Sequence, residues 1–319
     1  MVSLSDIRSA QALLRGIALH TPLLEWTSAA DQRKLYLKLE NLQPIGAFKL
    51  RGAYNKVASL SAEERRRGVI SYSSGNHGQG VAYAARALGL KAVIVMPRDA
   101  PKNKIAATAV LGAEVITVGP GSEERRIRAE ELAAEHGYAI VPPYNDEKII
   151  AGQGTVGLEI LEDMPDVGTV LVPVGGGGLI SGVAAAIKLS NRRVKVIGVE
   201  PELAADAQAS FRAGRIVSSP AEQVCLTLAD GLRTQSVGAL NFEHIRAYVD
   251  DIVTVSEEEI RAALGALSSN IQTVAEPSGA VSLAAFLFHA GELPDTKITA
   301  AVISGGNIDP SLLADLGRE

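Results

Sequence analysis

Short apolar runs alternate with longer alanine-rich stretches of helical spacing along most of this chain, and this rhythm limits the possible folds more than any other feature. The short runs predict strands over residues 68–73, 92–96, 114–118, 138–141, 169–174, 194–200 and 298–303. The longer stretches predict helices over residues 80–88, 123–136, 180–189, 257–267 and 278–288. Strands and helices that alternate in this way predict an α/β fold, in which helices cover both faces of open parallel sheets.

The grouping of these elements predicts two domains. Residues 68–145 hold four of the predicted strands and would form a small domain, whereas residues 1–60 and 146–319 would together form a larger one. The chain would then leave the large domain and return to it. Because ligands bind beyond the carboxyl ends of parallel strands, we expect the active site in the cleft between the domains.

Charge and composition exclude several classes of protein. The chain has 319 residues, a net charge of -5 and 47% apolar residues, enough to bury a sizeable core. It has no long basic run for nucleic acid, no uninterrupted apolar span for a membrane and no residues typical of a signal peptide. Cys225 is the only cysteine, so no intrachain disulfide forms, and we expect it to be a buried small side chain. These features predict a cytoplasmic protein without nucleic-acid or membrane partners.

Lys49 lies in the segment Gly-Ala-Phe-Lys-Leu-Arg-Gly-Ala (46–53), just after the alternating run 36–40. A lysine at the end of a strand, beside the aromatic Phe48, suits a nucleophile that forms a Schiff base with a carbonyl group. Burial beside apolar neighbours would lower the pKa of the amine and so supply its unprotonated form. The alternative is a solvated surface charge, which is the commonest state of a lysine.

Four consecutive glycines, Gly175, Gly176, Gly177 and Gly178, follow a predicted strand and open a predicted helix. Backbone amides in such a loop approach an anion closely, which predicts a phosphate site. Glu200 ends the next strand at about the distance of a ribose-binding acid, so the dinucleotide site of an NAD-binding oxidoreductase is the alternative. No register of these glycines matches G-x-G-x-x-G/A, and this weakens that alternative. A plain strand-to-helix turn would need fewer glycines.

Two further polar segments follow predicted strands. Ser73, Ser74, Asn76 and His77 precede a helix, where hydroxyl, amide and free backbone N–H groups bind a carboxylate and the phenolic oxygen of a cofactor. A helix cap alone would need only one of these side chains. Ser304 follows the predicted strand 298–303, and its hydroxyl suits a heterocyclic nitrogen without requiring that nitrogen to carry a proton.

Taken in order, these segments resemble those of the fold-type II pyridoxal-phosphate enzymes, specifically the serine/threonine dehydratase and serine racemase family. The motifs Gly-Ala-Phe-Lys-Leu-Arg-Gly-Ala, Ser-Ser-Gly-Asn-His-Gly, Gly-Gly-Gly-Gly-Leu and Ser-Gly-Gly-Asn occur here in that family's order, and the similarity extends over about residues 6–309. The resemblance implies a fold like that of tryptophan synthase β and pyridoxal 5′-phosphate as the cofactor.

The resemblance also implies a role for each site residue. Lys49 would hold the cofactor covalently, and Ser304 would face its ring nitrogen. The other cofactor contacts would be Phe48, Asn76, Gly175, Gly176, Gly177, Gly178, Leu179 and Gly231. The substrate contacts would be Ser73, Ser74, Asn76, His77 and Arg125. Arg125 is equally well interpreted as one charge on the surface of a helix.

The same resemblance offers a cation site within residues 200–206. Glu200, Asp206 and the carbonyl oxygen of Ala204 are hard oxygen ligands that suit Mg²⁺ or Ca²⁺. The alternative is the ordinary acidity of a helix start after Pro201.

The implied reaction is loss of the β-hydroxyl of L-serine, L-threonine or a related amino acid such as 3-hydroxyaspartate, which gives a 2-keto acid and ammonia. Lys49 would remove the α-proton. Ser74 lies where serine racemases place a hydroxyl, so the alternative is a serine or aspartate-like racemase with Ser74 as a second catalytic residue. The run Ala-Asp-Gly-Leu-Arg-Thr (229–234) is closer to the racemase and hydroxyaspartate branch than to threonine dehydratases. Because dimers are common among similar enzymes, we expect a homodimer.

Overall fold

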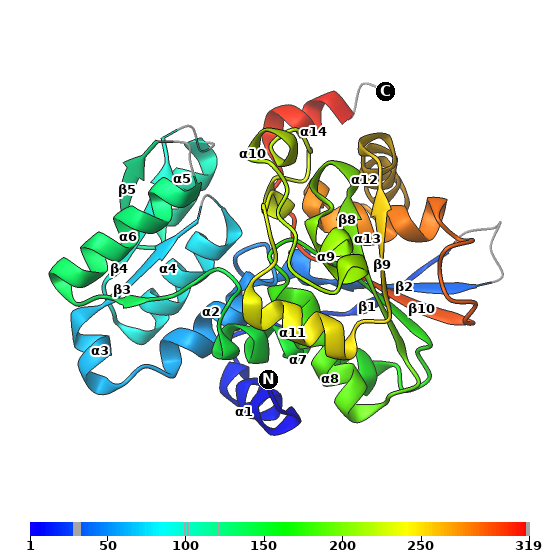
Figure 1. The fold of residues 1–319 in the computed structure, drawn as a ribbon, viewed down its shortest axis with the longest axis horizontal. Coiled ribbons are helices and arrows are strands. Elements are labelled where there is room, and N and C mark those ends of the chain that lie inside the picture. Colours follow the sequence, from blue (N-terminus) through cyan, green and yellow to red (C-terminus); the bar gives the residue numbers. More distant parts are fainter. Residues whose placement is uncertain (28–32, 74, 99, 101, 120–121, 317–319) are drawn as a thin grey trace.

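The structure is a computed structural model that describes residues 1–27, 33–73, 75–98, 100, 102–119 and 122–316 (Figure 1). Its strands are β1 (Leu23–Trp26), β2 (Lys34–Leu39), β3 (Val69–Tyr72), β4 (Ala92–Pro97), β5 (Glu114–Val118), β6 (Ala139–Ile140), β7 (Thr169–Pro173), β8 (Lys195–Pro201), β9 (Asp251–Val255) and β10 (Ile298–Ile303).

The α-helices are α1 (Leu4–Leu14), α2 (Lys49–Ala58), α3 (Ala62–Arg67), α4 (Asn76–Leu88), α5 (Lys102–Val110), α6 (Ser122–His136), α7 (Glu147–Asp163), α8 (Gly178–Ser190), α9 (Asp206–Ala213), α10 (Ala221–Val224), α11 (Ala239–Tyr248), α12 (Glu257–Ile271), α13 (Pro277–Phe288) and α14 (Pro310–Leu316). Short 3-10 helices are η1 (Glu40–Leu42), η2 (Glu202–Ala204) and η3 (Asp230–Leu232).

The larger sheet has six strands in the order β1-β2-β10-β7-β8-β9. Neighbouring strands are parallel except for β1 and β2, which are antiparallel. Helices α12 and α13 pack on one face, and α7, α8 and α11 pack on the other (Figure 1). Because both faces are covered, a central strand such as β7 is buried along its whole length and is apolar at almost every position.

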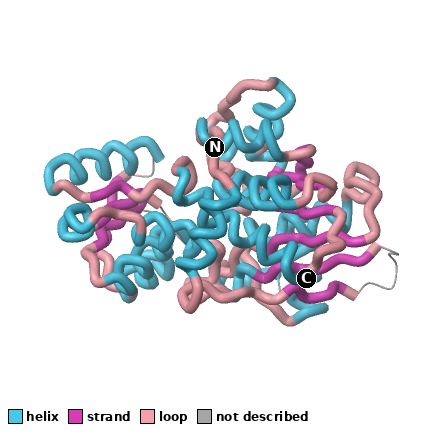
Figure 2. Tube along the Cα trace, turned by 90° about the horizontal axis from the view of Figure 1, so that it is seen from below, coloured by secondary structure: helices cyan, strands magenta, loops and turns pink. Residues whose placement is uncertain are grey.

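The smaller sheet has four parallel strands in the order β5-β4-β3-β6, all drawn from residues 69–140. Side chains of α2 and α4 pack on one face of this sheet, and side chains of α6 pack on the other. Figure 2 shows the strands gathered in two separate groups with helices between them. The carboxyl ends of β3, β7 and β10 open onto one shared pocket.

Helix α2, which begins at Lys49, packs tightly against both α4 and α7. At the crossing with α7, a Cβ added to Gly152 would lie 2.6 Å from the Cα of Gly52, so the two backbones touch and no larger residue fits. On the other side, a Cβ added to Gly80 of α4 would lie 3.2 Å from the carbonyl oxygen of Lys49. These close approaches fix the position of the first residue of α2.

A buried ion cluster anchors the same helix. Arg51 Nε donates to Glu40 Oε2 at 2.7 Å, and Arg51 Nη1 donates to Glu159 Oε1 at 2.6 Å. Lys38 Nζ lies 2.7 Å from Glu159 Oε2. All four side chains are buried, so each charge depends on its partners for compensation.

The α/β architecture expected from the sequence is confirmed. Each strand predicted from an apolar run is present, and each end agrees with the prediction to within one residue. The predicted helix 80–88 begins earlier, at Asn76, and β1, β9 and α7 were not predicted. The domain boundaries stay a prediction. Within the part of the chain that the structure describes, no helix combines the length and apolarity needed to cross a membrane.

Two local predictions were wrong. Lys49 does not end a strand; β2 stops at Leu39, η1 and a loop follow, and Lys49 is the first residue of α2. Cys225 is exposed rather than buried, because it ends the short helix α10 at the surface.

Candidate active site

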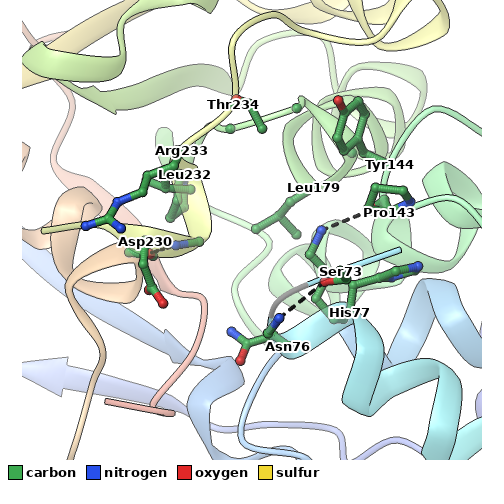
Figure 3. Close-up of a pocket in the computed structure, with 18 of the residues that line it drawn as sticks. Ser73, Asn76, His77, Pro143, Tyr144, Leu179, Asp230, Leu232, Arg233 and Thr234 are labelled. Atoms are coloured by element: carbon green, nitrogen blue, oxygen red, sulfur yellow. Dashed lines mark hydrogen bonds between the residues drawn. The ribbon is translucent and has the colours of Figure 1, made fainter. Parts of the chain in front are cut away.

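A pocket of about 380 Å³ lies where the carboxyl ends of β3, β7 and β10 meet (Figure 3). Most of the site residues expected from the sequence line it, although they come from distant parts of the chain. These are Phe48, Lys49, Ser73, Asn76, His77, Arg125, Gly175, Gly176, Gly177, Gly178, Leu179, Gly231 and Ser304. Ser74 lies outside the described residues. The fold therefore brings these residues together, and the individual roles assigned to them stay predictions.

Lys49 is held inside this pocket. The backbone N–H of Phe48 donates to the carbonyl oxygen of Ser304 at 3.1 Å, which docks the start of α2 on the end of β10. Lys49 Nζ lies 5.2 Å from the centre of the Phe48 ring and donates to the carbonyl oxygen of Pro143 at 2.9 Å. Burial lowers the pKa of Lys49 to about 8, against the opposing effect of the Glu276 charge. This amine loses its proton more readily than an ordinary lysine, as a Schiff-base nucleophile requires.

The loop 175–178 connects β7 to α8 and fits a phosphate group. Gly177 has φ of +91°, a left-handed conformation that favours glycine. A Cβ added to Gly176 would lie 2.3 Å from Tyr144 Cδ1, so the loop lies directly against the tyrosine ring. Helix α8 begins at Gly178, and the N–H groups of its first turn have no acceptor within the helix. Free amides at the positive end of a helix suit the phosphate of pyridoxal phosphate.

Asn76 and Ser304 reach the pocket from different sheets. Asn76 follows β3 at the start of α4, and its Nδ2 donates to Glu276 Oε1 at 2.5 Å. Ser304 follows β10, and its Oγ donates to the carbonyl oxygen of Ser278 at 3.4 Å. Ser278 Oγ in turn accepts from the backbone N–H of Gly231 at 2.8 Å. An amide and a neutral hydroxyl on the wall of one pocket suit the polar edge of a pyridine ring.

The substrate-binding candidates differ in their surroundings. His77 is buried, and its Nε2 lies 3.1 Å from the carbonyl oxygen of Val141. Burial, together with the charge of Lys49, lowers the pKa of His77 to about 3, so its ring is neutral at physiological pH. Ser73 Oγ accepts from the backbone N–H of Gly75 at 3.4 Å. Arg125, on α6, lines the same pocket.

Several pocket residues were not singled out from the sequence, namely Lys104, Tyr144, Asp230 and Glu276. Figure 3 shows Tyr144 and Pro143 on one side of the pocket and Asp230 and Arg233 on the other. Lys104 forms an ion pair with Asp230. Burial, and secondly the charge of Asp230, raise the pKa of Glu276 to about 7. In the sequence, Glu276 precedes Pro277 at the start of α13, which is typical of an ordinary helix beginning.

Glu200 and Asp206 come together outside this pocket. Glu200 accepts from the backbone N–H groups of Ala207 at 2.9 Å and Gln208 at 2.7 Å. Both oxygens of Asp206 are buried, and the nearby backbone N–H groups of Asp206 and Val237 and the hydroxyl of Thr234 only partly offset the cost of that burial. Burial raises the pKa of Asp206 to about 7, and burial with the charge of Asp206 raises the pKa of Glu200.

Two buried, mutually repelling carboxylates fit a divalent cation, and the carbonyl of the buried Ala204 is a third candidate ligand. Over the described ranges, no cluster of three or more His, Cys, Asp and Glu side chains has metal-binding geometry, so a cation would need backbone oxygens and waters as well. The burial of Glu200 also argues against a ribose-binding role, which requires an acid at an open groove.

Comparison with known proteins identifies the family. Residues 15–305 match the family model described as pyridoxal-phosphate dependent enzyme. The L-threonine ammonia-lyase of Thermotoga maritima is 48% identical, over 98% of this chain and 77% of its own. The L-threo-3-hydroxyaspartate ammonia-lyase of Saccharomyces cerevisiae is 42% identical, over 98% of this chain and 96% of its own. The structure of maize serine racemase has a TM-score of 0.93 and 36% identity, over 99% of this chain and 97% of its own. The resemblance seen in the motifs is confirmed, and the chain belongs to the family of pyridoxal-phosphate dependent enzymes.

Proposed function

We propose that this chain is a pyridoxal-phosphate dependent ammonia-lyase, which removes the β-hydroxyl of a 3-hydroxy amino acid and releases a 2-keto acid and ammonia. The observation that carries the proposal is the position of Lys49, whose amine of lowered pKa shares one pocket with Ser304 and the loop 175–178. The two ammonia-lyase relatives support the reaction class.

The residues of the pocket have complementary tasks in this proposal. The bound cofactor supplies an electron sink for negative charge at the substrate α-carbon. The amides of residues 175–178 bind its phosphate, and Asn76 donates to its phenolic oxygen. Lys49 would hold the cofactor, and its free amine would accept the α-proton of the substrate. Ser304 is a neutral partner for the ring nitrogen, which favours prompt loss of the β-hydroxyl.

The substrate carboxylate would bind at the start of α4. Ser73 and the backbone N–H groups of the first helical turn, that of Asn76 included, offer donors there, and the positive end of the helix adds to their attraction. Arg125 would contribute from α6. His77, being neutral, would hold the turn in place through Val141 rather than supply a charge.

The test offers the protein L-serine, L-threonine and L-threo-3-hydroxyaspartate in turn and measures the release of keto acid and ammonia from each. The wild-type protein should turn over at least one of the three, and Lys49→Ala should abolish release. Lys56→Ala is the matched control, because Lys56 lies in the same helix and pairs with Asp146 outside the pocket. Undiminished release by Lys49→Ala would defeat the proposal.

Racemisation is the second candidate, favoured by the likeness to maize serine racemase. It requires a proton donor on the face of the α-carbon opposite Lys49, and Ser74 is the residue that the sequence assigns to it. Ser74→Ala should suppress formation of D-serine and spare ammonia release. Equal loss of both activities would contradict this role.

We also propose that Glu200, Asp206 and the carbonyl of Ala204 bind Mg²⁺ or Ca²⁺. The burial of both Asp206 oxygens beside the carboxylate of Glu200 supports this, because a buried ionised carboxylate is costly without a compensating charge. The remaining ligands would be waters.

We further propose that the chain has two domains, forms a homodimer and is located in the cytoplasm. A small domain of residues 68–145 within a large one of residues 1–60 and 146–319 is supported by the confinement of the smaller sheet to residues 69–140. We expect a homodimer because dimers are common among similar enzymes; the exposed side chains of Leu42 and Val274 would be candidate contacts, since their segments are joined by the hydrogen bond from Asn41 to the carbonyl of Val274. The exposed thiol of Cys225 suits the cytoplasm.

A further inference from the structure

The amide group of Asn76 is held from two sides. Its Nδ2 donates to Glu276 Oε1 at 2.5 Å, and its Oδ1 accepts from Asn307 Nδ2 at 2.9 Å. Asn307 Nδ2 also donates to the carbonyl oxygen of Ile45 at 2.8 Å. If the amide turned over, its oxygen would face a carboxylate and its NH₂ group would face another NH₂ group. Glu276 and Asn307 therefore select one orientation of Asn76.

Two glycines lie directly against these three side chains. A Cβ added to Gly305 would lie 2.4 Å from Glu276 Oε1 and 3.1 Å from Asn76 Nδ2. A Cβ added to Gly46 would lie 2.5 Å from Asn307 Oδ1. Glycine at these two positions leaves room for the three side chains, and any larger residue at either glycine would push the hydrogen-bonded groups apart.

Glu276 is placed to act on the contents of the pocket. It is 2% exposed, lines the pocket, and its Oε2 is buried without a hydrogen-bond partner among the described residues. A buried carboxylate with a free oxygen is costly unless nearby charges stabilise it. Lys104 and Lys49 provide that charge, and Asp230 opposes it. The charge of the Glu276 carboxylate therefore depends on the charged residues of the pocket.

We propose that Glu276 is a positioning residue for the cofactor: with Asn307, it turns the amide of Asn76 so that the second Nδ2–H is directed to the phenolic oxygen of pyridoxal phosphate. This inference rests on the proposed function, which supplies the contact between Asn76 and that oxygen. A hydrogen bond donated to an ionised phenolic oxygen is charge-assisted and depends strongly on direction. A wrongly turned amide would present its own oxygen to the phenolate and repel it.

The test compares cofactor binding in Glu276→Ala, Glu276→Gln and Ser282→Ala. Ser282 lies in the same helix α13, and its buried hydroxyl has no partner among the described residues, so Ser282→Ala is the matched control. Glu276→Ala should raise the dissociation constant of pyridoxal phosphate about tenfold to a hundredfold, the usual cost of a lost charge-assisted hydrogen bond. Its absorption spectrum should shift toward the form with a protonated phenolic oxygen. Glu276→Gln keeps an acceptor for Asn76, so its constant should rise only about threefold.

The inference is wrong if Glu276→Ala has both the wild-type dissociation constant for pyridoxal phosphate and the wild-type absorption spectrum. Should Glu276→Ala fail to fold, as judged by thermal unfolding of the cofactor-free protein, Glu276→Gln decides through a double-mutant cycle. At about pH 9, where Lys49 is largely unprotonated with either residue at position 276, Glu276→Gln should have little further effect on the constant or the spectrum in an Asn76→Ala background, because its remaining effect acts through Asn76. An effect as large as in the wild type would overturn the inference. Both readouts are taken without substrate, so this failure is distinct from failure of the proposed function, which is judged by keto acid release.

Discussion

Lys104 and Asp230 form an ion pair across the active-site pocket, between helix α5 beside the smaller sheet and η3, which also contains Gly231. The side chain of Lys104 is 7% exposed and that of Asp230 is 36% exposed, so the pair is only partly screened by water. It links the two walls between which the cofactor and the substrate would bind.

Loss of this pair should weaken substrate binding more than the chemical step. Lys104→Met should raise KM about tenfold and change kcat by less than about threefold, because the walls of the pocket are held together less well. Lys91→Met is the control, since the Lys91–Glu114 pair is exposed. A fall in kcat at unchanged KM would instead give Lys104 a part in the reaction itself. Asp230→Asn in the Lys104→Met background should add little further loss.

Formation of the bond between protein and cofactor should depend on the proton of Lys49. Its pKa of about 8 lies well below the value near 10.4 of an ordinary lysine. Only the unprotonated amine attacks a carbonyl, so the rate at which cofactor-free protein takes up pyridoxal phosphate should rise up to about pH 8 and then level off. In Glu276→Gln the plateau should begin at lower pH, because the charge of Glu276 raises the pKa of Lys49. Stopped-flow absorbance measures this rate, and a continued rise toward about pH 10 would show that the amine is not desolvated.

Arg51 should matter for stability rather than for the reaction. Arg51→Met leaves the buried carboxylates of Glu40 and Glu159 without their main partner, which should cost about 3–5 kcal/mol of unfolding free energy. Arg128→Met removes an exposed pair with Glu131 on α6 and should cost less than about 1 kcal/mol. Urea denaturation of the cofactor-free proteins compares the two. Similar midpoints would mean that the ion cluster contributes no more than a surface pair.

Removal of divalent cations should destabilise the protein if Asp206 is a ligand. A chelator should lower the unfolding temperature, and Mg²⁺ or Ca²⁺ should restore it. Asp206→Asn should remove the response to both, because an amide in place of the carboxylate takes away the charge that binds the ion. If the chelator leaves the unfolding temperature of the wild-type protein unchanged, no stabilising cation is bound at this site.

The sequence predicts the core strands well because they carry a strong local signal. Buried parallel strands are continuous apolar runs, and β5 and β10 match their predicted ranges residue for residue. The edge strand β1 was missed because it is short and partly exposed, with only Trp26 buried. Lys49 was placed at a strand end although Pro44 and Gly46, both typical turn residues, lie between β2 and α2.

Some residues of the candidate site could likewise be predicted from local sequence motifs, and others could not. Glycines and hydroxyls after strands form recognisable motifs, so Lys49, Asn76 and Ser304 could be chosen in advance. Glu276 could not be chosen in advance, because its local sequence is typical of the start of an apolar helix and its partner Asn76 lies two hundred positions away. A role that arises from a contact between distant segments has no local signal, and only the fold reveals it.

Borohydride reduction of the cofactor-loaded protein, followed by peptide mapping with mass spectrometry, identifies the lysine that holds the cofactor. Reduction makes a Schiff base permanent and so marks the lysine that holds the cofactor. We expect a pyridoxyl group on the peptide that contains Lys49, and none on that peptide from Lys49→Ala. A pyridoxyl group on another lysine such as Lys104, or no modified peptide at all, would contradict this expectation.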